Sequence, residues 1–146
     1  MSNLVLIRHG QSTYNLQNRF TGWKDVPLTD KGISEAVRAG KYFKEHQISF
    51  DLAYTSNLSR AQHTLDIIMQ QMNIKLEVIK DTALNERDYG DLIGQNKAEA
   101  AKEFGKDQVQ RWRRSYDTPP PGGESLKMTC DRTLPYFKNY ILPRLK

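Results

Sequence analysis

The sequence predicts an α/β fold in three layers, α/β/α, in which helices cover both faces of a mainly parallel sheet. Two observations support this prediction. Residues 4–7 are an uninterrupted run of β-prone apolar side chains, as in a strand buried on both faces of a parallel sheet. Strand-like and helix-like stretches then alternate, which is typical of parallel strands joined by right-handed crossovers. The 146 residues fit one ordinary domain, residues 1–146, with enough interior for a core.

The first half of the chain supplies this alternation. After an ordered loop at 11–28, Thr29 caps a helix whose apolar residues recur at helical spacing. A short strand is expected at 51–54, and a second helix follows from 58 to 72. A third strand is expected at 76–79, which completes the strand–helix–strand pattern.

The second half of the chain is expected to be mostly helical. Residues 97–104 and 107–116 are helical by composition, and a break rich in proline and glycine follows at 119–123. A last helix begins near Leu126, and we expect Pro135 to kink it, since proline lacks the N–H that an interior helical residue donates.

Composition restricts the class of protein. The hydrophobic fraction of 38% and the charged fraction of 27% are those of a soluble globular protein. No stretch approaches the ~20 apolar residues that a membrane span requires, and the N-terminal run lacks the basic leader of a secretory signal. One cysteine excludes an internal disulfide. We therefore expect a cytoplasmic protein in which Cys130 is a buried thiol on the apolar face of the last helix.

The net charge of +5 favours anionic partners without choosing among them. The basic residues are dispersed, apart from Arg111, Arg113 and Arg114 around Trp112. The tyrosines do not interleave with lysines as they do in proteins that bind single-stranded nucleic acid. We therefore expect neither nucleic acid nor a membrane to be a partner.

The first candidate site residues stand at the end of the first expected strand. Arg8 and His9 follow the apolar run, and Gly10 admits a ligand close to the backbone. In open α/β sheets, ligands collect at the carboxyl ends of strands. Arg60, at the start of the second expected helix, can face the same crevice as His9. On the Arg-His pair alone, the simpler interpretation is a strand that ends in a solvated polar loop.

These residue types suit phosphoryl transfer. A neutral imidazole, whose ordinary pKa is about 6.5, can attack phosphorus directly. The reaction also needs a positioned acid or base, such as Glu86, and positive charge around the phosphoryl oxygens. That charge can come from Arg8, Arg60, Lys97, Arg113 and Arg114. Each residue alone is weak evidence, because Glu86 can simply pair with Arg87. His46 and His63 lie within expected helices, so we expect both to be structural or solvated.

Five segments carry a specific resemblance; they are residues 8–12, 15–23, 55–61, 84–90 and 113–117. Over essentially its whole length, the chain resembles the cofactor-dependent phosphoglycerate mutases of the histidine phosphatase superfamily. The Arg-His-Gly motif of the first segment indicates only the superfamily. The Asn-Arg-Phe-Thr-Gly-Trp and Glu-Arg-x-Tyr-Gly motifs of the second and fourth segments point to the mutase branch.

The resemblance implies the reversible interconversion of 3-phosphoglycerate and 2-phosphoglycerate through a phosphohistidine, a step of glycolysis and gluconeogenesis. It implies 2,3-bisphosphoglycerate as the priming phosphoryl donor and no metal. The implied partners are small phosphorylated carboxylic acids and further copies of the chain in a homo-oligomer. Two alternatives stay open. One is a phosphatase of broader specificity that uses the same phosphohistidine, and the other is a non-catalytic binder of phosphate ligands.

The resemblance also implies roles for single residues. His9 would carry the phosphoryl group, Glu86 would donate and accept the proton, and Arg8 and Arg60 would hold the transferred group. The other anionic groups of the substrate would be held by Gln11, Ser12, Asn15, Thr21, Gly22, Arg87, Tyr89, Lys97, Arg113 and Arg114.

The chain departs from the family pattern at two places. Asp88 stands where the family commonly has histidine, which adds a negative charge near an anion site. The pattern also continues past Leu145 into a strand that carries a second catalytic histidine, and nothing in this sequence matches that strand. We therefore expect an incomplete domain that lacks the C-terminal strand and helix, with mutase activity lowered by orders of magnitude. We also expect it to be unstable alone or to pack its exposed edge against another chain.

Overall fold

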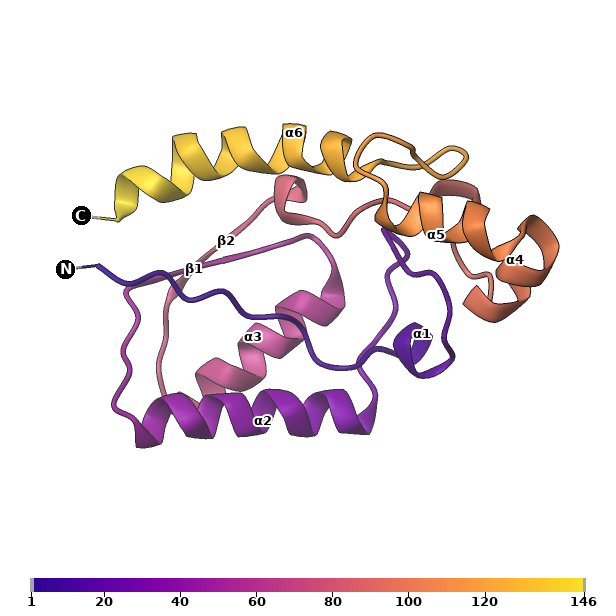
Figure 1. Cartoon of the computed structure of the whole chain (residues 1–146). Helices are drawn as coiled ribbons and strands as arrows, with labels where there is room; N and C mark the ends of the chain where they lie inside the picture. The colour runs from indigo at the N-terminus through magenta and orange to yellow at the C-terminus, as the bar shows by residue number, and fades with distance from the viewer. Residues whose placement is uncertain (1, 146) are drawn as a thin grey trace. The chain divides into compact units, whose positions relative to one another are not determined.

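The computed structural model describes residues 2–145. The helices and strands, in chain order, are α1 (Thr13–Leu16), α2 (Asp30–Glu45), β1 (Leu52–Thr55), α3 (Ser59–Met72), β2 (Glu77–Lys80), α4 (Lys97–Phe104), α5 (Lys106–Arg114) and α6 (Leu126–Tyr136) (Figure 1). They belong to two compact units. Unit 1 contains residues 2–7, 18–23 and 86–145, and unit 2 contains residues 8–17 and 24–85.

Unit 2 contains the parallel sheet that the sequence predicts. β1 pairs with β2 in parallel, with Leu52 opposite Glu77 and Thr55 opposite Lys80. α3 connects the two strands and packs against both β1 and α2. The buried core of this unit includes Leu28, against which Ala36 of α2 and Ile67 of α3 pack. The predicted alternation of strand and helix is therefore confirmed between residues 29 and 80, and the α/β fold class with it.

The bounds of α2 follow from local sequence. The Thr29 side chain accepts a hydrogen bond from the Gly32 N–H at 3.1 Å, as an N-cap does, and the helix begins at the next residue. Backbone bonds from Thr29 N to Gln11 O and from Thr13 N to Pro27 O hold the two ends of the 11–28 loop together. The stretch predicted to be a loop also contains the short helix α1.

Unit 1 has a core of its own, in which Phe20 and Leu92 pack with Ala100 of α4 and Val109 of α5. Residues 18–23 are bonded along the 94–97 segment. Phe20 N donates to Gln95 O, Gly94 N donates to Phe20 O, and Lys97 N donates to Asn18 O. Short α-helices at 97–104 and 106–114 match the sequence prediction within two residues.

The predicted strand at residues 4–7 is wrong. None of these residues belongs to a strand, and all four side chains are exposed, with Leu6 at 86%. An apolar strand needs neighbours that bond its backbone and cover both its faces. Among the described residues, the sheet consists of β1 and β2, and residues 4–7 lie outside it. An apolar run indicates that its side chains favour burial, but it does not show that another element packs against them.

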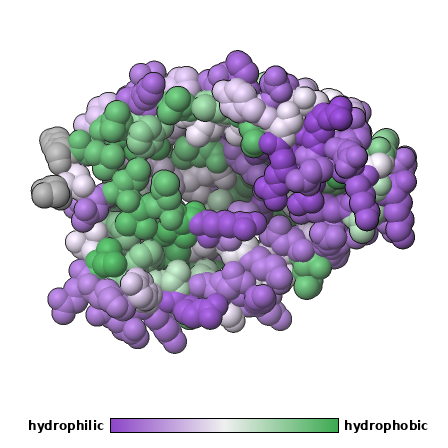
Figure 2. All heavy atoms as spheres, in the orientation of Figure 1, coloured by the Kyte–Doolittle hydropathy of each residue, from purple (hydrophilic) through white to green (hydrophobic). Residues whose placement is uncertain are grey.

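The last helix also differs from its prediction. It begins at Leu126 as expected, and after Pro135 it changes from α geometry to a π turn over Phe137–Ile141. Cys130, predicted to be buried, is exposed, as are Leu126 and Leu134 on the same side of α6. Figure 2 shows apolar atoms at the surface over this C-terminal helix. Helical spacing identifies an apolar face but not whether another element covers it.

Candidate active site

The predicted site residues fall in both units, and each group is described within its own unit. In unit 2, His9 lies in the loop before α1, with its imidazole half-buried. Its Nδ1 is 2.6 Å from the Gly10 carbonyl oxygen. A carbonyl only accepts, so Nδ1 carries the hydrogen and Nε2 keeps a lone pair. A neutral imidazole with a lone pair on Nε2 is a nucleophile.

Arg60 supplies positive charge beside this nitrogen. The residue lies in the first turn of α3 and is 0% exposed. Its Nε donates to His9 Nε2 at 3.4 Å, and its Nη1 donates to the Lys24 carbonyl oxygen at 2.8 Å. A guanidinium keeps its charge when buried, so Arg60 can stabilise an anionic group that reaches His9. The prediction that Arg60 lies near His9 is confirmed.

The backbone next to His9 is fixed by α3 and by the start of α2. Gly10 N donates to Thr64 Oγ1 at 3.1 Å, and Thr64 Oγ1 donates to the Arg60 carbonyl oxygen at 2.8 Å. A Cβ on Gly10 would collide with the Gly32 carbonyl oxygen, so only glycine fits there. Sequence reasoning missed Thr64, because a threonine within an amphipathic helix carries no signal of its own.

The other unit 2 candidates take part in local structure. Ser12 is fully buried and caps α1, and its Oγ accepts from Asn15 N at 3.2 Å. The Asn15 side chain in turn accepts from Ser12 N at 2.9 Å, which completes a capping box. Gln11 Oε1 accepts from Thr29 Oγ1 at 2.9 Å. Arg8 is exposed.

In unit 1, Glu86 is exposed, while its carbonyl oxygen is held by two donors. Trp23 Nε1 donates to this oxygen at 2.7 Å and Arg132 Nη2 donates to it at 3.0 Å. Asp88, two residues further on, bends the chain locally, because its Oδ1 accepts from Gly90 N at 2.9 Å. The Asp88 carboxylate therefore has a structural task in a turn.

Arg87 is buried and is bound to the end of α5. Its Nη1 donates to Trp112 O at 2.9 Å, and its Nη2 donates to Arg113 O at 2.9 Å and to the Tyr89 hydroxyl at 3.2 Å. A cation at the last carbonyls of a helix satisfies them and complements the helix dipole. Arg87 thus fixes the end of the helix that carries Arg113 and Arg114.

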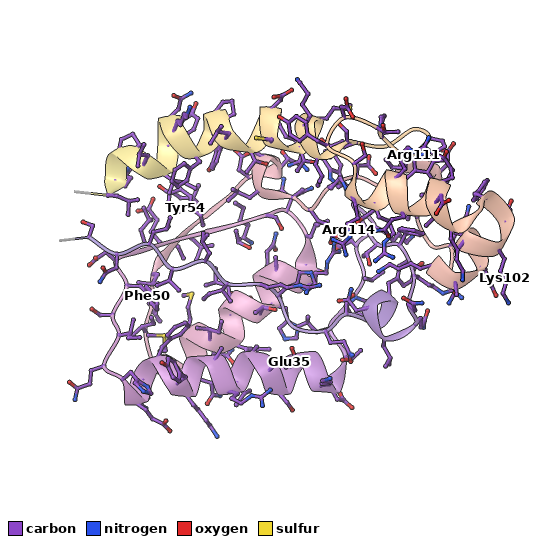
Figure 3. The ribbon with its side chains drawn as sticks, in the orientation of Figure 1. Glu35, Phe50, Tyr54, Lys102, Arg111 and Arg114 are labelled. Atoms are coloured by element: carbon purple, nitrogen blue, oxygen red, sulfur yellow. The ribbon has the colours of Figure 1, made fainter. Side chains whose placement is uncertain are left out.

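The remaining unit 1 candidates surround this segment. Thr21 is buried, and Gly22 has a φ of +54°, with a Cβ built on it 2.9 Å from Tyr89 N. Lys97 Nζ lies 5.8 Å from the centre of the Phe20 ring. At the end of α5, Arg114 is exposed and Arg113 is half-buried; Figure 3 labels Arg111 and Arg114 on this helix.

In unit 1, Glu124 forms an ion pair with Arg132, whose Nε lies 2.8 Å from Glu124 Oε2. Burial opposes its ionisation, but hydrogen bonds from Arg132 and Asp88 N, with the charges of Arg132 and Arg87, outweigh burial and lower the pKa of its carboxyl group. A depressed folded-state pKa contributes stability that is present above the ordinary value of 4.5 and is lost as pH falls through the folded-state pKa. Glu124→Gln should therefore lower the urea midpoint at neutral pH more than in acid below 4.5. An equal loss of urea midpoint at neutral and at acid pH would contradict a lowered pKa for Glu124.

Among residues 2–145, no group of three or more histidine, cysteine, aspartate and glutamate side chains is arranged to hold a metal ion. Within the same range, no helix combines the length and the apolar character that a membrane crossing needs.

Residues 4–141 match the profile of the histidine phosphatase superfamily, branch 1. The chain is 60% identical over 141 residues to the 2,3-bisphosphoglycerate-dependent phosphoglycerate mutases of Nitrobacter hamburgensis and Bradyrhizobium diazoefficiens. It is 57% identical over 143 residues to the mutase of the same name from Parvibaculum lavamentivorans. In these alignments the chain is covered to 96–97%, and each relative to 68%.

Solved structures agree with this family. A structure named mycobacterial hydrolase 1 superposes with a TM-score of 0.80 at 28% identity, over 94% of this chain and 64% of that one. A mycobacterial glucosyl-3-phosphoglycerate phosphatase in complex with VO3 superposes with a TM-score of 0.78 at 28% identity, over 92% and 64%. The chain therefore spans somewhat less than two thirds of the length of these structures.

Proposed function

The chain belongs to the histidine phosphatase superfamily and groups with its 2,3-bisphosphoglycerate-dependent phosphoglycerate mutases, and we propose that it interconverts 3-phosphoglycerate and 2-phosphoglycerate. The family resemblance predicted from the sequence is confirmed by relatives at 57–60% identity. The proposed primer is 2,3-bisphosphoglycerate, which these relatives carry in their names.

One observation carries the proposal: His9 is held with its Nε2 lone pair beside a fully buried guanidinium. In the priming step, Nε2 attacks a phosphorus of 2,3-bisphosphoglycerate. The N–P bond forms, the P–O bond breaks, and the released oxygen takes a proton from Glu86. Arg60 and Arg8 offset the charge on the phosphoryl oxygens during transfer.

The second half of the reaction reverses these steps with a different acceptor oxygen. A hydroxyl of phosphoglycerate gives its proton to Glu86, attacks the phosphorus, and the N–P bond breaks as the His9 lone pair returns. The proposed holders of the remaining carboxylate and phosphate oxygens are Gln11, Ser12, Asn15, Thr21, Gly22, Arg87, Tyr89, Lys97, Arg113 and Arg114.

A phosphatase is the second candidate, since a solved phosphatase shares the fold at 28% identity. The mutase proposal is favoured by the 60% identity to relatives of that name. The test is to supply the chain with 3-phosphoglycerate and measure 2-phosphoglycerate and inorganic phosphate, with and without 2,3-bisphosphoglycerate. Formation of 2-phosphoglycerate that depends on the primer would support the mutase. Release of phosphate alone would support the phosphatase. Binding of 3-phosphoglycerate without turnover would support a non-catalytic role.

We propose a cytoplasmic homo-oligomer in which residues 4–7 contact another copy of the chain. Neighbouring apolar side chains that are exposed favour self-association, and Leu6 is 86% exposed. Burying one leucine is worth about 1.5–3 kcal/mol. Leu6→Lys should therefore weaken dimerisation about 10- to 100-fold in sedimentation measurements. Leu16→Lys, at an exposed leucine of α1, should leave it unchanged. A monomeric unaltered chain would contradict the proposal.

A further inference from the structure

We propose that Arg132 is a positioning residue for Glu86: it holds the 86–88 segment of unit 1 in the conformation that proton transfer needs. The inference rests on the proposed acid–base role of Glu86. Arg132 lies on α6, far from Glu86 in sequence, and it has no role in the proposed phosphoryl transfer. Its side chain is 21% exposed, so its guanidinium is largely withdrawn from water.

The first contact is with the carbonyl oxygen of Glu86 itself. Arg132 Nη2 donates to that oxygen at 3.0 Å, and Trp23 Nε1 donates to the same oxygen at 2.7 Å. The Arg132 guanidinium also lies over the Trp23 ring, 5.4 Å from its centre. The two donors therefore contact each other and share one carbonyl oxygen as their acceptor.

The second contact reaches Asp88 through Glu124. Arg132 Nε and Nη2 donate to the two carboxylate oxygens of Glu124 at 2.8 and 3.0 Å, a bidentate pair. The Oε1 of Glu124 accepts from Asp88 N at 2.9 Å, and Glu124 N donates to Asp88 O at 2.8 Å. Arg132 thus binds Glu86 directly and Asp88 through one intermediate, so both ends of the three-residue segment are held.

This arrangement matters because the backbone at 86–88 sets the point from which the Glu86 side chain extends. A misplacement of a reacting group by about 1 Å can cost on the order of 10²-fold in rate. A planar guanidinium can make the bidentate pair and the third bond to Glu86 together, whereas an ammonium cannot reproduce that geometry. The ionised state of Glu124 keeps the pair intact at neutral pH.

The experiment compares Arg132→Met and Arg132→Lys with Lys127→Met, which removes an exposed ion pair on the same helix. The first readout is phosphoryl transfer from the phosphorylated 146-residue chain to 3-phosphoglycerate. Arg132→Met should lower the transfer rate at saturation about 10- to 100-fold with little change in the half-saturating concentration. Arg132→Lys should recover only part of this loss, and Lys127→Met should cost nothing.

A double-mutant cycle separates positioning from general stability. In a Glu86→Gln background, Arg132→Met should cost less than about twofold, because the group it positions is already gone. If Arg132→Met lowers the transfer rate in the Glu86→Gln background by the same factor as in the unaltered chain, the proposal is overturned.

Hydrogen exchange of the 86–88 amides gives a readout that does not depend on activity. Arg132→Met should speed exchange there while the core amides of α4 stay protected. Unchanged exchange at 86–88 would overturn the proposal. A chain that transfers no phosphoryl group at all would instead refute the proposed function, and the exchange measurement would still decide whether Arg132 holds this segment.

Discussion

His9→Ala should abolish the phosphoryl label that the chain takes from 2,3-bisphosphoglycerate. The label requires a nitrogen lone pair, which in unit 2 is held on His9 Nε2 by the Nδ1 bond to the Gly10 carbonyl oxygen. Alanine removes the nucleophile and leaves the helices that surround it in place. The measurement is the mass of the intact chain after incubation with the donor, and the expected loss is complete.

His63→Ala is the matched control. His63 lies on α3, the helix that carries Arg60, and its side chain is exposed. Its replacement should leave labelling unchanged within about twofold, since it removes a solvated imidazole. Label that persists in the His9 variant, or disappears in the His63 variant, would assign the nucleophile to another residue.

Glu86→Gln should slow phosphoryl transfer by about 10²–10⁴-fold, the usual contribution of a general acid or base. The amide keeps the size of the side chain and cannot take the proton of the attacking hydroxyl. Because Glu86 is exposed, and because Trp23 and Arg132 donate to its main-chain oxygen, which glutamine keeps, the fold should persist. The measurement is the single-turnover rate from the phosphorylated chain to 3-phosphoglycerate, with circular dichroism to confirm the fold.

Glu103→Gln provides the comparison, since Glu103 is an exposed glutamate of the same unit on α4. Its rate should match that of the unaltered chain. A loss below about tenfold for Glu86→Gln would remove Glu86 from proton transfer and leave it a structural role.

Local elements of this fold were predictable from the sequence because their causes are local. Thr29 and the apolar spacing after it determine where α2 begins, whatever the rest of the chain does. The same holds for α4, whose cap is Asn96. The position of Arg60 in the first turn of α3, shortly after β1, is local in the same way. Its contact with His9, 51 residues away in the chain, is not.

The errors concern residues whose state depends on distant neighbours. The apolar run at 4–7 was expected to be a buried strand, and Cys130 to be a buried thiol, yet both are exposed. In each case the spacing of apolar residues shows which face favours burial. Burial itself requires a second element that packs against that face. No residue within the pattern reports whether that element is present.

The supporting contacts of the candidate site could not be predicted for a related reason. Thr64 and Arg132 act on backbone groups that lie 54 and 46 residues away in the chain. A threonine within a helix and an arginine on an amphipathic one have many ordinary explanations. Their roles are visible only from their long-range hydrogen bonds, and the periodicity of a helix does not predict such bonds.

The most direct test of the account is the chemistry of the label on the unaltered 146-residue chain. The chain is incubated with 2,3-bisphosphoglycerate. One portion of the product is then treated with acid and another with base, and both are analysed by peptide mapping. We expect a single phosphoryl group on the peptide that contains His9, lost in acid and retained in base, as a phosphorus–nitrogen bond requires. No label, or an acid-stable label on a serine or threonine, would contradict the assignment of this chain as a phosphohistidine enzyme.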